Sequence, residues 1–246
     1  MLSLRKITKS FPGRFSAIIK SLDLEISPEE FCVIIGSNGS GKSTLMRCIS
    51  KEYSIDSGSI SSKRNLTIAA VTQDISKGTI SEMTLLENFH LSKLIGKSAS
   101  FKFYNNDRNE AYALFKELNI GLEKYIDQTL GALSGGQRQM IATLMAINSN
   151  PDILLLDEHT SALDPNSQKL LMEYTAKSIK DKKITSIMIT HRLDDAIRYG
   201  NRLIMLHEGE IVFDIKGKEK QELNVEQLLK LFHKYEDLSY VQSFSH

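Results

Sequence analysis

Residues 36–43 read Gly36-Ser37-Asn38-Gly39-Ser40-Gly41-Lys42-Ser43, which is a complete G-x-x-x-x-G-K-[ST] phosphate loop. The apolar run 31–35 precedes it and predicts a buried strand, and residues 43–50 after it predict a helix. This order of strand, loop and helix is the context in which such a loop forms a cradle for a polyphosphate. We therefore expect an α/β protein built around this unit.

The residues of the loop are expected to have separate roles in binding phosphate. Its glycines allow the backbone to curl so that N–H groups point inward, and the start of the next helix adds partial positive charge. Lys42 is expected to reach the β and γ phosphates, and the Ser43 hydroxyl to bind Mg²⁺. A glycine-rich surface turn with a stray lysine is the alternative, which the flanking elements disfavour. The predicted phosphate ligands are Gly36, Ser37, Asn38, Gly39, Ser40, Gly41, Lys42, Ser43 and Thr44.

The composition is that of an ordinary globular protein. The chain has 246 residues, of which 41% are hydrophobic and 25% charged, and its formal net charge is +1. This charge gives no reason to expect binding to nucleic acid or anionic lipid. We expect no secretory signal, and no apolar run is long enough to span a bilayer, so a function at a membrane would need another chain. Cys32 and Cys48 are expected to be buried thiols in a reducing compartment.

Hydrophobic periodicity divides the chain into strands and helices. Residues 79–130 carry apolar positions at helical spacing, with a polar loop expected over 97–107, and a helix resumes over 137–147. Residues 55–58 are interpreted as a loop. Val225, Leu228, Leu229 and Phe232 share one helical face, which is expected to pack on its own domain, and partner binding is the alternative. The predicted strands are 2–7, 18–26, 31–35, 66–71, 153–156, 184–190, 202–206 and 210–215.

Two further strings carry chemistry. The apolar strand 153–156 ends in Asp157, which is placed to hold Mg²⁺, and Glu158, which is placed to accept a proton from an attacking water. Two ordinary loop carboxylates are the alternative.

Residues 133–137, Leu-Ser-Gly-Gly-Gln, open a helix and so form a second anion-binding N-terminus. Because one cradle is already complete, this helix start is expected to cover the γ-phosphate held by a second copy of the chain, and a simple helix cap is the alternative.

These strings, in this order, resemble the ATP-binding cassette (ABC) ATPase family over nearly the whole chain. Residues 36–43 resemble its Walker A loop, 133–137 its signature, 153–157 its Walker B strand and 161–164 its D-loop. The resemblance implies a P-loop NTPase core with a parallel sheet, an N-terminal antiparallel β subdomain and a helical subdomain inserted at about 79–150. It also implies that 1–246 form a single ATPase domain.

The resemblance implies a mechanism that uses ATP and Mg²⁺. Two copies would bind two ATP molecules head to tail, with Ser134, Gly135, Gly136 and Gln137 of one copy covering the γ-phosphate held by the other. The further roles that it implies are catalytic glutamate for Glu158, γ-phosphate contact for His191, Mg²⁺ site for Ser43, Gln73 and Asp157, and organisation of the attacking water for Gln73. It also implies that Phe11, with Phe15 second, stacks on the adenine, and ordinary core aromatic residues are the alternative.

One residue departs from the family pattern. Proline commonly follows the catalytic glutamate, and here His159 removes its backbone restriction and adds a titratable ring. Because Glu158 and the D-loop are intact, we expect activity. Together with residues 201–205 and 207–212, His159 resembles the ATPase subunits of bacterial uptake systems that have a separate permease and a lipoprotein-type substrate-binding protein.

That narrower resemblance implies amino-acid uptake, with tryptophan or related aromatics as cargo, at the cytoplasmic face of the cell membrane. An ATPase of an exporter or of a lipid or lipoprotein extraction system remains the alternative. A family member acting on ribosomes or DNA is disfavoured, because the chain has one cassette, a short helical insertion and a near-neutral charge.

Overall fold

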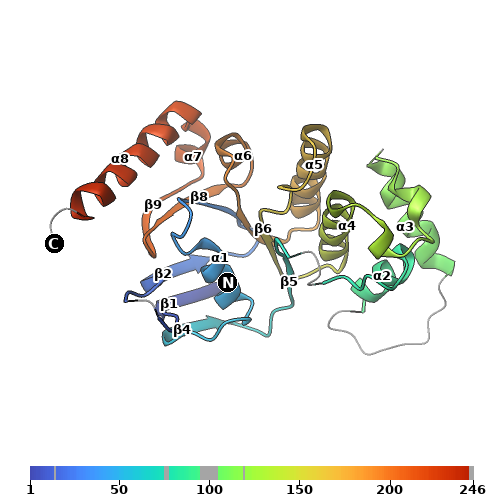
Figure 1. Cartoon of the computed structure of the whole chain (residues 1–246), viewed down its shortest axis with the longest axis horizontal. Coiled ribbons are helices and arrows are strands. Elements are labelled where there is room, and N and C mark those ends of the chain that lie inside the picture. Colours follow the sequence, from blue (N-terminus) through green and yellow to red (C-terminus); the bar gives the residue numbers. More distant parts are fainter. Residues whose placement is uncertain (14, 75–77, 95–104, 119, 244–246) are drawn as a thin grey trace. The chain divides into compact units, whose positions relative to one another are not determined.

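The computed structural model describes residues 1–13, 15–74, 78–94, 105–118 and 120–243, without the side chains of 105–107 and 236–243. The chain divides into two compact units (Figure 1). The first unit comprises residues 1–65 and 187–246, and the second comprises residues 66–186. Each unit is described by itself.

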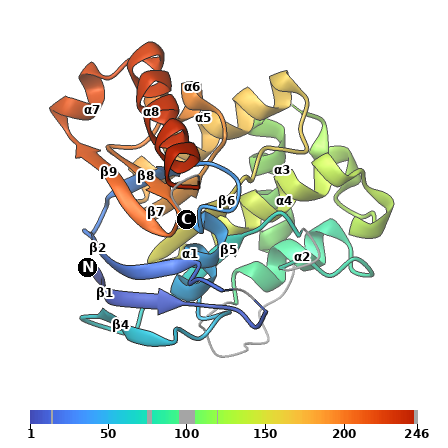
Figure 2. The same ribbon diagram turned by 60° about the vertical axis from the view of Figure 1, so that its left-hand side comes forward.

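The first unit contains a three-stranded antiparallel sheet in the order β2 (Ile19–Ile26), β1 (Leu2–Lys9), β4 (Ser57–Ser62). Figure 2 shows the three strands side by side, in blue and cyan. Alternate side chains of β1 and β2 are buried, and Leu4 lies opposite Leu24 in the register. The predicted N-terminal antiparallel subdomain is therefore confirmed.

Strand β4 corrects the interpretation of residues 55–58 as a loop, because Ser57 and Gly58 belong to it. Its sequence, Ser-Gly-Ser-Ile-Ser-Ser, has one apolar residue, and its side chains are exposed except for a half-buried Ile60. The strand is held by backbone hydrogen bonds to β1 at the edge of the sheet rather than by a buried face. A search for apolar alternation cannot find such a strand.

The first unit also contains the strand order β7 (Thr185–Ile189, of which 187–189 lie in this unit), β3 (Phe31–Ile35), β8 (Arg202–His207), β9 (Glu210–Lys216). Strands β3 and β8 run parallel, and every side chain of β3 is buried. Strands β8 and β9 form an antiparallel hairpin. The helices of this unit are α1 (Lys42–Ile49), α6 (Leu193–Arg198), α7 (Lys218–Glu222) and α8 (Val225–Ser243).

Arg202 is a buried charge that joins several segments of the first unit. Its guanidinium donates to both carboxylate oxygens of Asp214, at 2.8 and 2.6 Å, and to Glu30 Oε1 at 2.8 Å. It also donates to the backbone oxygen of Glu25 at 2.6 Å. A buried charge is tolerated when it is paired and hydrogen-bonded in this way. Arg202 thereby fixes β8 against β9 and against the segment that leads into β3.

The two cysteines lie in the first unit and are free thiols. Cys32 and Cys48 are both buried, and burial raises the pKa of each thiol above its ordinary value. A thiol with a raised pKa and little exposure is a poor nucleophile. The expectation of two buried thiols is confirmed.

The second unit contains the parallel pair β5 (Ile68–Val71) and β6 (Ile153–Asp157), in which Val71 lies opposite Leu156. Its remaining elements are α2 (Leu85–Ser92), α3 (Asn105–Glu117), α4 (Gly135–Asn148), α5 (Pro165–Asp181) and the 3₁₀ turns 122–125 and 130–132. Residues 97–104 of the expected loop lie outside the described residues. The expectation is wrong at 105–107, where the polar run Asn-Asn-Asp already begins α3.

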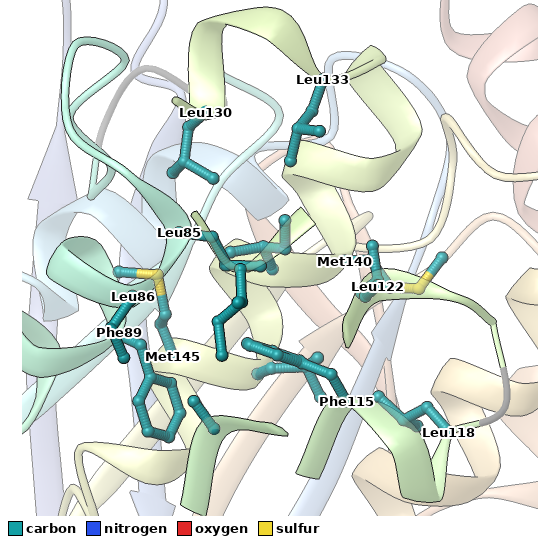
Figure 3. Packing of buried hydrophobic residues seen from close by; sticks show 14 of the residues in the cluster. Leu85, Leu86, Phe89, Phe115, Leu118, Leu122, Leu130, Leu133, Met140 and Met145 are labelled. Atoms are coloured by element: carbon teal, nitrogen blue, oxygen red, sulfur yellow. The ribbon is translucent and has the colours of Figure 1, made fainter. Parts of the chain in front are cut away.

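The helices of the second unit pack around one apolar cluster (Figure 3). The rings of Phe89 and Phe115 meet edge to face within it, with centroids 5.8 Å apart. Leu144, from the middle of α4, is fully buried in the same cluster. Helix α4 is therefore held along its length by close packing, which resists displacement.

Helix α8 matches the predicted apolar stripe only in part. Leu228 is buried and Phe232 is half-buried, as expected for packing within the unit, but 41% of Leu229 is exposed. The expectation that Leu229 packs with the others is wrong, because the helix faces its unit along a narrower stripe than the four positions cover. No helix among those described is both long enough and apolar enough to cross a bilayer.

Candidate nucleotide-binding site

The phosphate loop runs from the end of β3 to the start of α1, and close backbone contacts require glycine at two of its positions, 36 and 41. A Cβ at Gly36 would lie 2.1 Å from the backbone oxygen of Leu206 in β8. Gly41, the N-cap of α1, has φ +104°, and a Cβ there would lie 2.8 Å from the backbone oxygen of Ile18. Because real Cβ atoms do not approach oxygen so closely, the loop can pass beside these strands only with glycine at both positions.

Lys42 lies folded against the loop. Its Nζ donates to the backbone oxygens of Gly36, at 2.9 Å, and Ser37, at 2.8 Å, and its side chain is buried. These bonds hold the ammonium beside the loop, where a phosphate group would meet a positive charge. Ser43 and Thr44 follow in the first turn of α1, and Asn38 and Gly39 form the exposed tip of the loop.

The Ser40 side chain tests whether the loop fits a phosphate. Its Oγ is buried and has no hydrogen-bond partner within the part of the chain that the structure describes. The backbone of Ser40 is fixed, because its N–H donates to Ser37 O at 3.2 Å and its oxygen accepts from Gly209 N at 3.0 Å. A buried hydroxyl without a partner is costly, and a phosphate oxygen would satisfy it. The residues present therefore fit a bound polyphosphate.

His191 follows β7, the strand next to β3. The backbone N–H of Thr190 donates to Ile34 O at 3.4 Å, so the ends of β7 and β3 lie beside each other. His191 is exposed at this edge of the sheet, where the phosphate loop also begins. The first unit thus brings together two of the predicted groups, the phosphate loop and the histidine.

The two candidate aromatic residues for the adenine base differ in their surroundings. The half-buried Phe11 ring meets Tyr53 edge to face, with centroids 5.2 Å apart, and Lys9 Nζ lies 5.4 Å from its centroid. Phe15 is fully exposed. Phe11 is therefore held in place and Phe15 is not, which favours Phe11 as a stacking platform. The assignment stays a prediction.

The predicted carboxylates and Gln73 lie at one end of the β5–β6 pair in the second unit. Asp157 ends β6, Glu158 follows it, and Gln73 lies two residues after the end of β5. Since the strands are parallel and Val71 pairs with Leu156, these three residues leave the sheet at the same edge. The carboxyl ends of parallel strands are where ligands bind in open α/β sheets.

The turn that follows Asp157 has a fixed and unusual backbone. Glu158 has φ +51°, in the left-handed region that non-glycine residues rarely adopt, and such conformations are concentrated at functional sites. The turn ends at Asp164, whose Oδ1 accepts from the N–H groups of Asn166 and Ser167, at 3.1 Å each, as the N-cap of α5. Hydrogen bonds from Ser167, first from its side chain and then from its backbone, lower the pKa of Asp164.

His159 lies inside the second unit rather than at its surface, with 1% of its side chain exposed. Burial lowers its pKa from 6.5 to about 3, so the ring is neutral at neutral pH. Its Nε2 has no hydrogen-bond partner among the residues described. The sequence indicated a titratable ring here, but it gave no sign of this burial.

The predicted signature begins helix α4. The Ser134 Oγ accepts from Gln137 N at 3.2 Å, and Gln137 Oε1 accepts from Ser134 N at 3.0 Å, which is a capping box. The helix cap considered as the alternative is thus present. A Cβ at Gly136 would lie 3.0 Å from the backbone oxygen of Ala162, whereas none of the described atoms lies within 4 Å of a Cβ at Gly135. The structure therefore leaves open space on the Gly135 side of the helix start.

Comparison with known proteins shows the family. The family described as ABC transporter matches residues 19–161. The chain is 42% identical, over 94% of its length and 98% of the relative's, to the tyrosine transport ATP-binding protein of Clostridioides difficile. It is 32% identical to the phosphonates import ATP-binding protein PhnC of Mesoplasma florum, covering 93% of this chain and 99% of that one. This chain belongs to the ABC transporter family, as an ATP-binding cassette ATPase.

Solved structures agree with this fold. A dimeric ATP-binding cassette in a post-hydrolysis state, bound to ADP and Pi, has a TM-score of 0.77 at 28% identity, covering 88% of this chain and 98% of that one. A nucleotide-free cassette from an ABC transporter has a TM-score of 0.70 at 24% identity, covering 94% and 95%, which supports the fold alone. The predicted α/β P-loop NTPase class is confirmed.

The burial of His159 predicts a pH dependence of stability. The unfolded chain takes up a proton near the ordinary pKa of 6.5, whereas the folded chain does so only near 3, so stability falls as the pH drops through this window. Within this window, His159 should lower the free energy of unfolding by about 1.4 kcal/mol for each unit by which the pH is lowered. Urea unfolding of His159→Leu at about pH 7.5 and about pH 5.5 should show a smaller loss on acidification than the unsubstituted protein shows.

The matched control for this measurement is His233→Gln, since His233 is exposed on α8. It should follow the unsubstituted protein at both pH values. If His159→Leu also loses as much stability on acidification as the unsubstituted protein, the buried neutral ring is not the cause.

Proposed function

We propose that this chain is the ATP-hydrolysing subunit of a bacterial importer that takes up an amino acid through a separate permease. The similarity over nearly the whole of both chains to a protein named for tyrosine transport carries this proposal. The word import in the names of the phosphonate relatives favours uptake over export. The chain would act at the cytoplasmic face of the membrane, with a lipoprotein-type substrate-binding protein delivering the cargo to the permease.

In this proposal the loop 36–44 holds the phosphates of ATP, with Lys42 beside the β and γ groups, and Phe11 stacks on the adenine. Mg²⁺ would neutralise phosphate charge, held by Ser43, Asp157 and Gln73. Because Mg²⁺ usually binds to one or two carboxylates together with phosphate oxygens and water, a single aspartate is sufficient.

Glu158 is the proposed general base, which takes a proton from the attacking water. Gln73 orients this water, and His191 contacts the γ-phosphate. The left-handed backbone of Glu158 fixes the direction in which its carboxylate leaves the turn. A charged group held in advance in the productive direction needs no reorganisation during the reaction.

We propose that the catalytic unit is a dimer of two such chains with ATP at the interface. Residues 134–137 of one copy would cover the γ-phosphate held by the other, using the N–H groups at the start of α4. The open space beside Gly135 supports this, because an atom of a partner's nucleotide has room there. A solved relative of the same fold is itself described as dimeric and bound to ADP and Pi.

The proposed domain organisation is one ATPase domain, 1–246, with a helical subdomain at about 79–150. An apolar groove of about 420 Å³ in the second unit supports a docking surface for the permease on this subdomain. The groove is lined by residues of β5, α2 and α4, and by the segment that leads into α2. Two of the lining side chains, Ile80 and Leu91, are exposed apolar groups that a docked permease would cover.

The general base is tested by Glu158→Gln, which keeps the shape of the side chain and removes its basicity. ATP hydrolysis should fall at least about 100-fold, as expected when a general base is lost. ATP binding, measured by calorimetry, should remain, and light scattering should detect an ATP-dependent dimer. Glu173→Gln, on the exposed side of α5, is the control and should hydrolyse ATP normally. A normal rate for Glu158→Gln would show that another group activates the water.

The trans contact is tested by Gly135→Leu. None of the described atoms lies within 4 Å of a Cβ at this position, so the monomer should fold and bind ATP. In the dimer it would occupy the space assigned to the partner's γ-phosphate, so hydrolysis should fall by about 100-fold. Gly135→Ala should have a smaller effect. Equal loss of ATP binding by the monomer and of hydrolysis would argue against a contribution in trans.

The cargo is tested with the chain purified together with its permease and binding protein in lipid vesicles. Tyrosine or another aromatic amino acid should raise the ATPase rate, because cargo delivery would favour the closed dimer. A phosphonate should leave the rate unchanged. Stimulation by the phosphonate alone would contradict the amino-acid assignment and leave the ATPase assignment intact.

A further inference from the structure

We infer that Gln139 is a positioning residue, which fixes the turn carrying Glu158 to the helix that begins at the signature. Its side chain, on the first turns of α4, has 1% exposure. The Nε2 group donates to the backbone oxygen of Glu158 at 3.2 Å, and Oε1 accepts from the backbone N–H of Ala162 at 3.0 Å. One amide thus spans both ends of the segment 158–162.

The chemistry of this contact requires an amide. A backbone oxygen can only accept and a backbone N–H can only donate, so the bridging group needs a donor and an acceptor side by side. The two backbone partners also fix which way the Gln139 amide points. A glutamate would lose the donor toward Glu158, and a methionine would lose both bonds while filling a similar volume.

The segment that Gln139 spans needs such support. Glu158 has φ +51°, a conformation that costs free energy and persists only when neighbouring groups hold it. Its backbone oxygen accepts from Ser161 N at 3.0 Å as well as from Gln139. Two donors on one oxygen fix the plane of the peptide that follows Glu158. The side chain of Glu158 leaves the chain next to this plane, so its direction depends on these bonds.

The link to α4 is close along its whole length. A Cβ at Gly136 would lie 3.0 Å from Ala162 O and 3.2 Å from Leu163 Cδ2, so the helix start and the turn already touch. Because the apolar cluster holds α4, a movement of the helix start must move the turn, through contacts that have little room to absorb it.

This inference rests on the proposed dimer for its functional meaning. There, the signature of one copy serves the ATP held by its partner, whereas Glu158 serves the ATP held by its own copy. Gln139 joins these two groups within one chain. It therefore ties the geometry of one ATP site to that of the other, and its loss should impair the site to which its own chain contributes Glu158.

The first test compares Gln139→Met with Thr143→Val. The second variant removes a buried hydrogen bond internal to α4, from the Thr143 hydroxyl to the backbone oxygen of Gln139 at 2.9 Å, and leaves the bonds to the turn in place. For Gln139→Met, kcat should fall about 10- to 100-fold, as expected for a misplaced catalytic group, while the Kd for ATP and KM change by less than about twofold. Thr143→Val should melt at a temperature similar to that of Gln139→Met and should keep the ATP hydrolysis rate of the unsubstituted protein. Gln139→Glu, which keeps only the bond to Ala162, should lose activity as Gln139→Met does.

The second test mixes variants, so that each heterodimer combines two defects. Glu158→Gln mixed with Gly135→Leu should regain activity, because one of the two sites then has both a normal Glu158 and a normal signature. Gln139→Met should likewise regain activity with Gly135→Leu but not with Glu158→Gln. That pattern assigns Gln139 to the Glu158 side of the site.

Three results would overturn the inference. They are a normal rate for Gln139→Met, an equal loss of rate in Thr143→Val, and recovery when Gln139→Met is mixed with Glu158→Gln. Failure of the proposed dimer would look different, since Glu158→Gln and Gly135→Leu would then remain inactive when mixed. In that case the comparison of kcat with Kd in Gln139→Met still decides the positioning role.

Discussion

The approach of the phosphate loop to strand β8 is the constraint on which the remaining site geometry depends. At Gly36 the backbone passes so close to Leu206 O that no side chain fits. Directly after this contact, the backbone oxygens of Gly36 and Ser37 accept hydrogen bonds from the Lys42 ammonium. The Ser40 hydroxyl of the same loop is buried and finds no hydrogen-bond partner among the described residues. A backbone contact, rather than any catalytic group, is what shapes the site.

The parts of this protein that could be predicted from the sequence are those in which residue type is dictated by geometry. Glycine spacing predicts the phosphate loop because only glycine fits there, and the dense apolar runs predict β3 and β6 because both strands are buried on all sides. Strand β4 could not be found in this way, since its pairing with β1 involves backbone groups that every sequence has. The start of α3 was missed for a related reason, because polar residues at a helix start resemble a loop.

The supporting groups of the site were hidden for a different reason. Gln139 follows the signature in α4, and the apolar pattern of this helix does not predict a buried polar side chain. Its hydrogen-bond partners are backbone atoms 19 and 23 residues away. Only the folded chain brings them together. Likewise, nothing local indicates that His159 is buried while Glu158 beside it carries the predicted chemistry. Sequence patterns thus predicted the reacting groups, and the structure was needed to find the groups that hold them.

The two buried thiols have a practical consequence for labelling experiments on this protein. Cys32 and Cys48 are shielded and weakly acidic, so maleimide reagents will leave the native chain almost unmodified. A single cysteine introduced on the surface would then carry a dye or a crosslinker with little background. Placed at Ile80 or beside Gly135, such a probe would test the proposed permease docking and the proposed subunit closure separately, without first removing either native thiol.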